Sequence, residues 1–173
     1  NTISGNNITN NMYGIKFYLS NNNSLFGNTF VNDGMFVSDS YGNAVSNNTV
    51  NGQPLIYLEG LSDIFIENAG QVILINCNRI QVENLNLSNT TVGLLLLRTN
   101  HTTVAGTSMS NNIEGIVLEC SSNNNMVGNN IIANEWNGVD LYQSSNNIIA
   151  GNNITINNRS GIWLHSSLGN HLP

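Results

Sequence analysis

The chain is built on a short repeat in which a glycine is followed by an apolar residue, any residue and a second apolar residue. The clearest copies begin at Gly115, Gly138 and Gly161, so that consecutive copies lie 23 residues apart. A second mark, a Gly-Asn pair, follows 13 residues after two of these glycines, at Gly128 and Gly151. Two signals in fixed register, repeating every 20 to 50 residues, are typical of a chain that stacks equivalent structural units.

Each repeat contains three short β-like segments separated by polar corners. In the repeat led by Gly115 these segments are residues 116–119, 125–127 and 130–133. None has the length or the spacing of apolar residues that a helix needs. Three strands and three turns in about 22 residues describe one coil of a parallel β-helix. We therefore predict an all-β fold, a right-handed single-stranded parallel β-helix of about seven coils, because parallel connections are right-handed by default.

The pattern also predicts which side chains face the interior of the coil. Alternation along a strand sends the residues one and three places after each glycine inward. The columns expected in the core are Ile15 and Phe17, Leu94 and Leu96, Ile116 and Leu118, Val139 and Leu141, and Ile162 and Leu164. A recurring asparagine can donate and accept hydrogen bonds along the stacking direction, and it tolerates left-handed backbone angles. We predict that it forms a structural ladder of Asn6, Asn28, Asn48, Asn129 and Asn152.

The rhythm is broken between Gly34 and Gly70, which are 36 residues apart. The excess forms an irregular insertion near residues 51–68. Asn51-Gly52 is a strong turn dipeptide, so the insertion is either an undersized coil or a hairpin that leaves the stack. No shift in composition divides the chain, and residues 1–173 are interpreted as one domain. Because the chain opens and closes inside a repeat, we expect an internal fragment of a longer protein.

Charged residues make up only 8% of the chain, against about 25% in an average globular protein. The net charge is −6 and only four residues are basic. Such a chain cannot neutralise a row of phosphates, so nucleic acid and anionic membrane surfaces are excluded as partners. The longest apolar runs, such as residues 92–97, fall far short of the ~20 residues that span a bilayer. No direct membrane insertion is expected of this chain.

The most specific part of the pattern is the series of segments 51–58, 70–77 and 82–88. These segments resemble the NosD-type right-handed β-helix repeats, which are related to the carbohydrate-binding and sugar-hydrolase β-helix domains. The resemblance extends over nearly the whole chain. The combination is similar to repeats of secreted and cell-surface proteins of archaea, particularly methanogens. The resemblance implies a β-helix in an extracellular location, and it implies the scaffold more than the chemistry, since members of the family differ in activity.

Copper, which the family name implies, would require a cluster of His, Cys and Met side chains. His101, His165 and His171 fall in different coils or beyond the last complete one, and the methionines fall mostly at core positions. We predict no metal site and no cofactor; a copper-binding NosD-like protein stays as an alternative. Cys77 and Cys120 lie two coils apart, roughly 10 Å by strand spacing, which is too far for a disulfide. Two free, mostly buried thiols are expected.

Outward-facing positions supply the candidate binding surface. When the leading glycines are aligned, the carboxylates Glu119 and Asp140 become neighbours of Tyr142, Trp163 and His165. Aromatic faces pack against the C–H faces of sugar rings, and carboxylates accept hydrogen bonds from sugar hydroxyls. These five residues are predicted to contact a polysaccharide. A solvated sheet face that binds nothing is the alternative, and an acid and base pair for glycoside hydrolysis is another.

We expect a structural or adhesive extracellular module of an archaeal surface protein, with weak carbohydrate contact and no turnover. Self-association through the coil ends is also expected, because an uncapped coil exposes unpaired strand edges. The alternative is a polysaccharide-active enzyme that uses Glu119 and Asp140. Eight Asn-x-Ser/Thr sequons occur, although a chain this rich in Asn, Ser and Thr would show about six by composition alone. The corner positions Asn22 and Asn100 are the glycosylation candidates.

Overall fold

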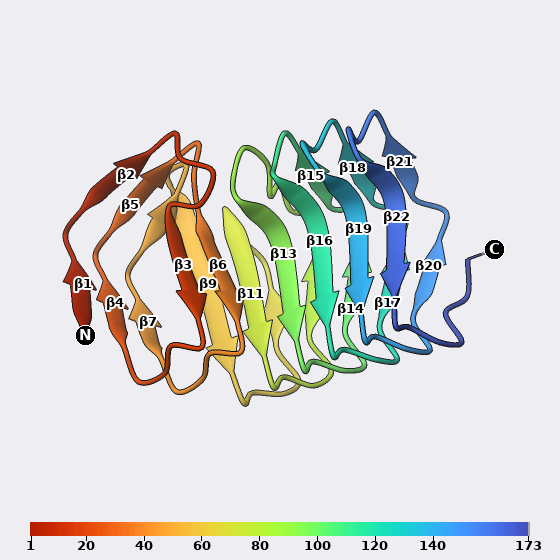
Figure 1. The fold of residues 1–173 in the computed structure, drawn as a ribbon, viewed down its shortest axis with the longest axis horizontal. Coiled ribbons are helices and arrows are strands. Elements are labelled where there is room, and N and C mark those ends of the chain that lie inside the picture. Colours follow the sequence, from red (N-terminus) through yellow and green to blue (C-terminus); the bar gives the residue numbers. More distant parts are fainter. Residues whose placement is uncertain (173) are drawn as a thin grey trace.

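The fold was taken from a computed structural model, which describes residues 1–172. Strands and turns wind into successive parallel coils (Figure 1). The predicted all-β parallel solenoid of about seven turns is confirmed. Within residues 1–172 there is no helix of the length and apolarity needed to cross a membrane. The coils are divided into two groups, an N-terminal stack of residues 1–50 and a C-terminal stack of residues 53–172.

The N-terminal stack contains eight short strands in three parallel sheets, ordered β1-β4-β7, β2-β5-β8 and β3-β6. Successive strands pair one coil later, with Ile15 opposite Met35 in the third sheet. The bounds are β1 Thr2–Ser4, β2 Asn7–Thr9, β3 Ile15–Tyr18, β4 Ser24–Phe26, β5 Thr29–Val31, β6 Met35–Ser38, β7 Ala44–Ser46 and β8 Thr49–Val50.

The C-terminal stack has one large sheet, β9-β11-β13-β16-β19-β22, and two smaller ones, β10-β12-β14-β17-β20 and β15-β18-β21. The three segments predicted after Gly115 appear as β16, β17 and β18. The bounds are β9 Gln53–Glu59, β10 Phe65–Ile66, β11 Gln71–Ile75, β12 Gln81–Glu83, β13 Val92–Leu97, β14 Thr103–Ala105, β15 Ser108–Ser110, β16 Glu114–Glu119, β17 Asn125–Val127, β18 Asn130–Ile132, β19 Asn137–Tyr142, β20 Ile148–Ala150, β21 Asn153–Thr155 and β22 Ser160–His165.

A hairpin joins the two stacks. Strands β8 and β9 pair antiparallel, with Val50 opposite Gln53, and every other strand pair is parallel among residues 1–172. Asn51 and Gly52 form the turn with φ angles of 51° and 80°, the left-handed values that a two-residue hairpin requires. Of the two interpretations of the irregular insertion, the hairpin that leaves the stack is therefore confirmed.

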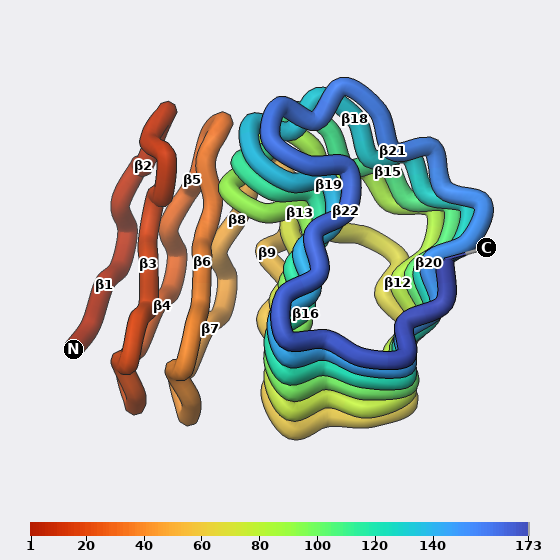
Figure 2. Tube along the Cα trace, turned by 45° about the vertical axis from the view of Figure 1, so that its right-hand side comes forward, coloured from red at the N-terminus to blue at the C-terminus, as the bar shows by residue number. Residues whose placement is uncertain are grey.

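After this reversal the N-terminal stack lies beside the C-terminal stack (Figure 2). Strand β6 packs over β13, and the two stacks share an apolar core, here called the interface core. Its buried members include Met35 and Val37 from β6 together with Ile73, Leu95 and Val117, which project from the outer face of the large sheet. Apolar burial of this kind is the main favourable term that holds two layers together.

The C-terminal stack has a separate core inside its coils. The columns predicted there, from Leu94 and Leu96 through Val139 and Leu141, are fully or almost fully buried. In the last described coil Ile162 packs against this core but Leu164 is exposed. Ile15 and Phe17 were predicted for the same columns, yet they lie in the interface core instead. This difference follows from the hairpin, which places the N-terminal coils on a different axis.

Buried side chains tie the free edge of β6 to the C-terminal stack. Because the chain leaves through the hairpin, β6 pairs only with β3. Gln71, which has no exposed surface, takes the place of the missing strand: its Oε1 accepts from Met35 N at 2.9 Å, and its Nε2 donates to Met35 O at 2.7 Å. Thr90 Oγ1 donates to Asp33 O at 3.1 Å beside it. An edge that is capped in this way keeps its buried backbone groups hydrogen-bonded.

Asparagines run along the corners in the stacking direction. Asn6 donates to Asn28 and Asn28 donates to Asn48, each from Nδ2 to Oδ1 at 2.9 Å. Asn129 donates to Asn152 over the same distance, and Thr107 N donates to Asn129 Oδ1 at 3.0 Å. The side chains predicted to form a ladder thus lie in two runs, one in each stack. Their hydrogen bonds satisfy turn backbone groups that the strands leave unpaired.

Candidate functional site

A groove of about 410 Å³ opens where the N-terminal stack meets the uncovered part of the large sheet. All five residues predicted to contact a polysaccharide line it. Residues from the other stack and from the corner before β19 complete it. The lining residues are Tyr13, Lys16, Phe36, Ser38, Asp39, Glu114, Val117, Glu119, Trp136, Asp140, Tyr142, Trp163 and His165.

The C-terminal wall of the groove follows directly from the strand register. Asp140 on β19 lies opposite Trp163 on β22, and Tyr142 lies opposite His165. Glu119 on β16 pairs with Tyr142. The His165 ring stacks on Trp163 with centroids 5.7 Å apart and planes 12° apart, and it lies 5.2 Å from the Tyr142 ring. Three aromatic rings therefore form a continuous surface with a carboxylate on each of the two preceding positions.

The N-terminal wall comes from β3, β6 and the loop before β3. Tyr13 and Phe36 meet edge to face with centroids 5.6 Å apart. Lys16 Nζ lies 4.7 Å from the Tyr13 centroid and 5.3 Å from that of Phe36, a favourable cation–π arrangement. Sequence reasoning missed this wall. Its residues are about 100 positions from the C-terminal wall in the chain, and the hairpin alone brings the two walls together.

Glu114 is a further groove residue that sequence reasoning missed. It precedes Gly115, and simple alternation would place it on the same face as Ile116, inside the coil. The strand bends at the glycine: Glu114 pairs with Val92 and Ile116 with Leu94, whereas Gly93 and Gly115 between them are not paired. A glycine at such a bend re-aims the residue beside it. Gly115 has no room for a Cβ, which would lie 2.5 Å from Gly138 O.

Burial raises the pKa of the Glu114 carboxyl from its ordinary 4.5 to about 7. The nearby Asp140 carboxylate raises it further, while Arg159 and a hydrogen bond with Asn137 act in the opposite direction. The Asn137 side chain is wholly buried, and its Oδ1 has no donor among residues 1–172. A protonated Glu114 carboxyl supplies such a donor, because only the neutral form of a carboxyl carries an O–H.

Burial also raises the pKa of both predicted carboxylates. For Glu119 the hydrogen bond with Ser38 opposes the effect; Ser38 Oγ donates to its two carboxylate oxygens at 3.1 and 3.3 Å. For Asp140 the opposing groups are Asn137, whose Nδ2 donates to Asp140 Oδ2 at 3.5 Å, and then Arg159 and His165. The Ser38 contact joins the two stacks at the side of the groove.

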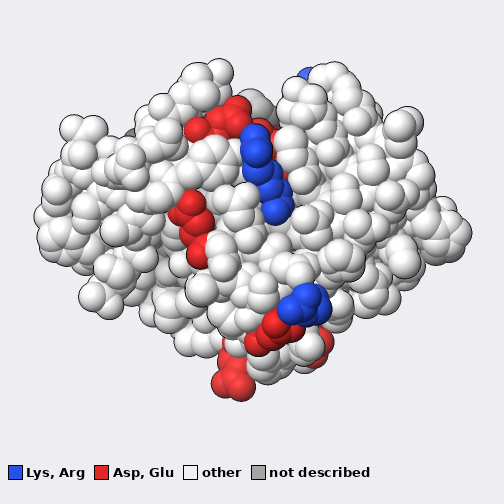
Figure 3. Space-filling view, turned by 90° about the horizontal axis from the view of Figure 1, so that it is seen from below, with Lys and Arg blue, Asp and Glu red and all other residues white. Residues whose placement is uncertain are grey.

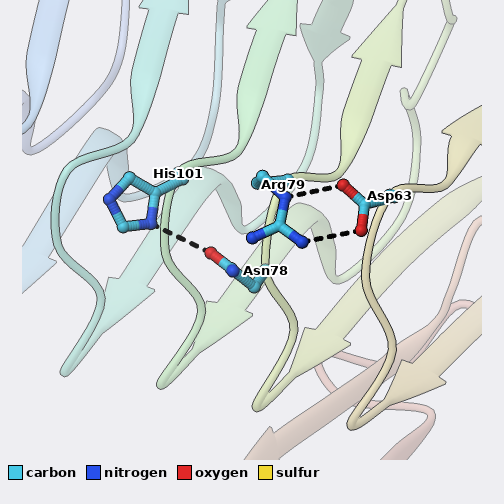
Figure 4. A network of polar contacts seen from close by, with 4 residues as sticks. All are labelled: Asp63, Asn78, Arg79 and His101. Carbon is cyan, nitrogen blue, oxygen red and sulfur yellow. Dashed lines mark hydrogen bonds and ion pairs between the residues drawn. The ribbon is translucent and has the colours of Figure 1, made fainter.

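The rest of the surface carries little charge. Figure 3 shows one face of the molecule, on which uncharged residues cover most of the area and the acidic and basic groups gather near the middle. Another hydrogen-bonded group of charged and polar side chains lies at the corners of consecutive coils (Figure 4). Arg79 donates to Asp63 at 2.6 and 2.7 Å, and His101 Nδ1 lies 2.9 Å from the Asn78 side-chain amide. The Asp63–Arg79 pair is exposed, and exposed pairs contribute little to stability.

Both cysteines are free, as predicted. Cys77 is buried and Cys120 is half-buried, so only the first has the burial expected of both. Asn22 lies exposed at a corner and Asn100 is half-buried. Asn100 Oδ1 accepts a hydrogen bond from Ser122 N at 2.8 Å. Glycosylation of these two asparagines stays a prediction.

Comparison with known proteins bears on the scaffold. The family model described as "Periplasmic copper-binding protein (NosD)" matches residues 1–69 and 61–172, which together span nearly the whole chain. The chain belongs to the NosD family. Its predicted resemblance to NosD-type repeats is thereby confirmed. A search of curated proteins found no match.

Among solved structures, this NosD-family chain is similar to mutants of the periplasmic alginate epimerase AlgG. For the T265N mutant the sequence identity is 23%, the TM-score 0.48, and the match covers 89% of this chain and 36% of the other. For the T265N T268M double mutant the values are 17% and 0.47, with 98% and 49% covered. The chain thus spans less than half the length of these proteins.

The copper-binding description can be tested against the residues present. Among residues 1–172 no three His, Cys, Asp or Glu side chains gather in a group that could hold a metal ion. His101 lies at the exposed corner of Figure 4 and His165 lies in the aromatic wall, while Cys77 is buried. Met35 and Met109 are sealed in the two cores. The soft ligands that copper favours therefore lie in separate places, and they do not fit a copper site.

Proposed function

We propose that this NosD-family chain is a β-helix module that binds polysaccharide in the groove between its two stacks. The observation that carries the proposal is the C-terminal wall, where Tyr142, Trp163 and His165 form one aromatic surface beside Glu119 and Asp140. Pyranose rings present apolar C–H faces and polar hydroxyl edges. A wall of aromatic faces bordered by carboxylates is complementary to both.

The second wall makes this a binding groove rather than a flat face. Tyr13 and Phe36 add apolar surface, and Lys16 and Ser38 add hydrogen-bond donors. A volume of about 410 Å³ lies within the roughly 300–1,000 Å³ of typical small-molecule sites. It suits a short stretch of a longer sugar chain, because the groove is open rather than enclosed. Rigid coils on both sides hold these side chains in place before a ligand arrives.

The setting in which such a module works is also part of the proposal. The family is described as periplasmic, which supports a location outside the cytoplasm, and we extend this to the cell surface. There, a module that holds a polysaccharide would serve a structural or adhesive role. The scarcity of charged residues and the abundance of Asn, Ser and Thr suit a surface that contacts sugars mainly through neutral hydrogen bonds.

Replacing Trp163 with alanine is expected to weaken polysaccharide binding about ten- to a hundredfold. Loss of a stacked aromatic ring removes about 1.5–3 kcal/mol of apolar contact with the sugar. Isothermal titration calorimetry with soluble oligosaccharides measures the change. Phe65→Ala is the matched control, since Phe65 is an exposed aromatic residue on a different sheet and should leave the affinity unchanged. Equal affinities for wild type and Trp163→Ala would contradict the proposal.

Glycoside hydrolysis is a second candidate, and one observation favours it. Glu114 holds a proton near neutral pH beside Asp140, and a protonated acid next to a carboxylate is the pair that glycosidic bond cleavage uses. In this interpretation Glu114, rather than the predicted Glu119, is the acid that acts with Asp140. New reducing ends released from a polysaccharide by the wild type, but not by Glu114→Gln or Asp140→Asn, would establish an enzyme. A binding module releases none in all three.

A further inference from the structure

The charges in the groove are unevenly distributed between its walls. Four of its lining residues are acidic, Asp39, Glu114, Glu119 and Asp140, whereas Lys16 is the only lysine or arginine among them. Lys16 belongs to the N-terminal wall, where its ammonium lies over the Tyr13 and Phe36 rings. The aromatic surface on which a sugar ring would stack is thus bordered by carboxylates.

This arrangement opposes a sugar that carries its own carboxylate. A uronate ring stacked on Tyr142 and Trp163 would place its negative charge close to Glu119 and Asp140. Like charges in a half-buried groove repel one another more strongly than in bulk water, because the effective dielectric constant is lower. The net charge of −6 on the chain adds a longer-range repulsion.

The same arrangement favours a sugar that carries an amine. A protonated amino group on a ring stacked at Trp163 can donate charge-assisted hydrogen bonds to Asp140 and Glu119. It is also attracted to the faces of the neighbouring aromatic rings by the cation–π interaction. Arg159 already shows the geometry from the outer side, since its guanidinium carbon lies 4.9 Å from the Trp163 ring centroid.

We propose that the groove selects polysaccharides with free amino groups, polymers of unacetylated hexosamine, over neutral chains and over uronate chains. This inference rests on the proposed carbohydrate-binding function and adds its substrate class. It assigns Asp140 and Glu119 the role of specificity determinants. Trp163, Tyr142 and His165 supply affinity for the sugar ring of any of these chains.

The test compares three hexasaccharides of equal length: glucosamine, glucose and a uronic acid. Calorimetry at mildly acidic pH, where the amine is protonated, is expected to give an affinity about tenfold higher for the glucosamine hexamer than for the glucose hexamer. The uronate hexamer should bind least tightly. Raising the salt concentration should narrow these differences, because exposed charges are screened.

Asp140→Asn isolates the charge. It should remove most of the preference for glucosamine while changing the affinity for the glucose hexamer less than twofold. Asp63→Asn makes the same chemical change in the exposed ion pair outside the groove and should leave the preference intact. Uronate binding as tight as glucosamine binding, or a preference that survives Asp140→Asn, overturns this inference alone if the glucose hexamer still binds through Trp163. Absence of binding to all three hexamers overturns the proposed function with it.

Discussion

Replacing Leu95 with alanine is expected to lower the free energy of unfolding by about 2–5 kcal/mol and also to weaken polysaccharide binding. Leu95 is wholly buried in the interface core, on the outer face of β13 under the N-terminal stack. Truncation removes its apolar contacts and leaves a cavity between the stacks. The N-terminal wall of the groove rests on this interface, so its position relative to Trp163 should become less well defined.

Leu94→Ala is the matched control for this experiment. Leu94 is the adjacent residue and is equally buried, but it points into the C-terminal coil. Its truncation should cost a similar free energy of unfolding, measured by urea denaturation, and leave the affinity of the folded protein unchanged. Both tryptophans of the chain line the groove, so their fluorescence reports on this region in both variants. Equal binding by Leu95→Ala and Leu94→Ala would show that the groove does not depend on the packing of one stack on the other.

The coils could be predicted from the sequence because the repeat is in strict register. Once Gly115, Gly138 and Gly161 are aligned, strand pairing at a period of 22 to 23 residues determines which side chains are neighbours. Tyr142 and His165 therefore meet as the alignment requires. The same argument located the C-terminal wall of the groove, since that wall is formed entirely by adjacent strands of one sheet.

The side-by-side packing of the stacks could not be predicted in this way. Asn51-Gly52 indicated a reversal, but a turn dipeptide does not determine where the preceding coils will lie. A signal was nevertheless present on the outer face of the sheet. Ile73, Leu95 and Val117 are apolar at outward positions, whereas Asp140 and Trp163 occupy the same row further along. Strands that are apolar on both faces are covered on both, and this change of character marks where the cover ends and the groove begins.

Glu114 shows why strict alternation is insufficient within a strand. The alternating pattern holds from Gly115 onward, but the bend at the glycine reverses it for the residue before. The sequence shows the glycine without showing the bend, since close packing requires the absence of a side chain and the φ angle at Gly115 is not in the left-handed region. The acid with the most perturbed environment in the groove was therefore assigned to no site.

The stability of the protein is expected to fall as the pH rises from about 4.5 to about 7, and Glu114 should account for much of the fall. Below this range both the folded and the unfolded chain hold the Glu114 proton, so the residue contributes no difference. Within it the unfolded chain loses the proton first, because its carboxyl has the ordinary pKa of 4.5 and the folded one has a pKa of about 7. The folded state then binds more protons, and the free energy of unfolding decreases with pH, by roughly 3 kcal/mol in total.

Glu114→Gln removes this titration while keeping the shape and polarity of the side chain. Its free energy of unfolding, from urea denaturation at a series of pH values, should vary less with pH than that of the wild type, by about 3 kcal/mol across the range. A smaller slope of the same sign should persist, because burial also raises the pKa of Glu119 and Asp140. Glu67→Gln, at an exposed position outside the lining, should leave the wild-type slope intact. If Glu114→Gln retained that slope as well, the buried proton would have to be assigned to another carboxyl of the groove, and the acid role of Glu114 would be lost with it.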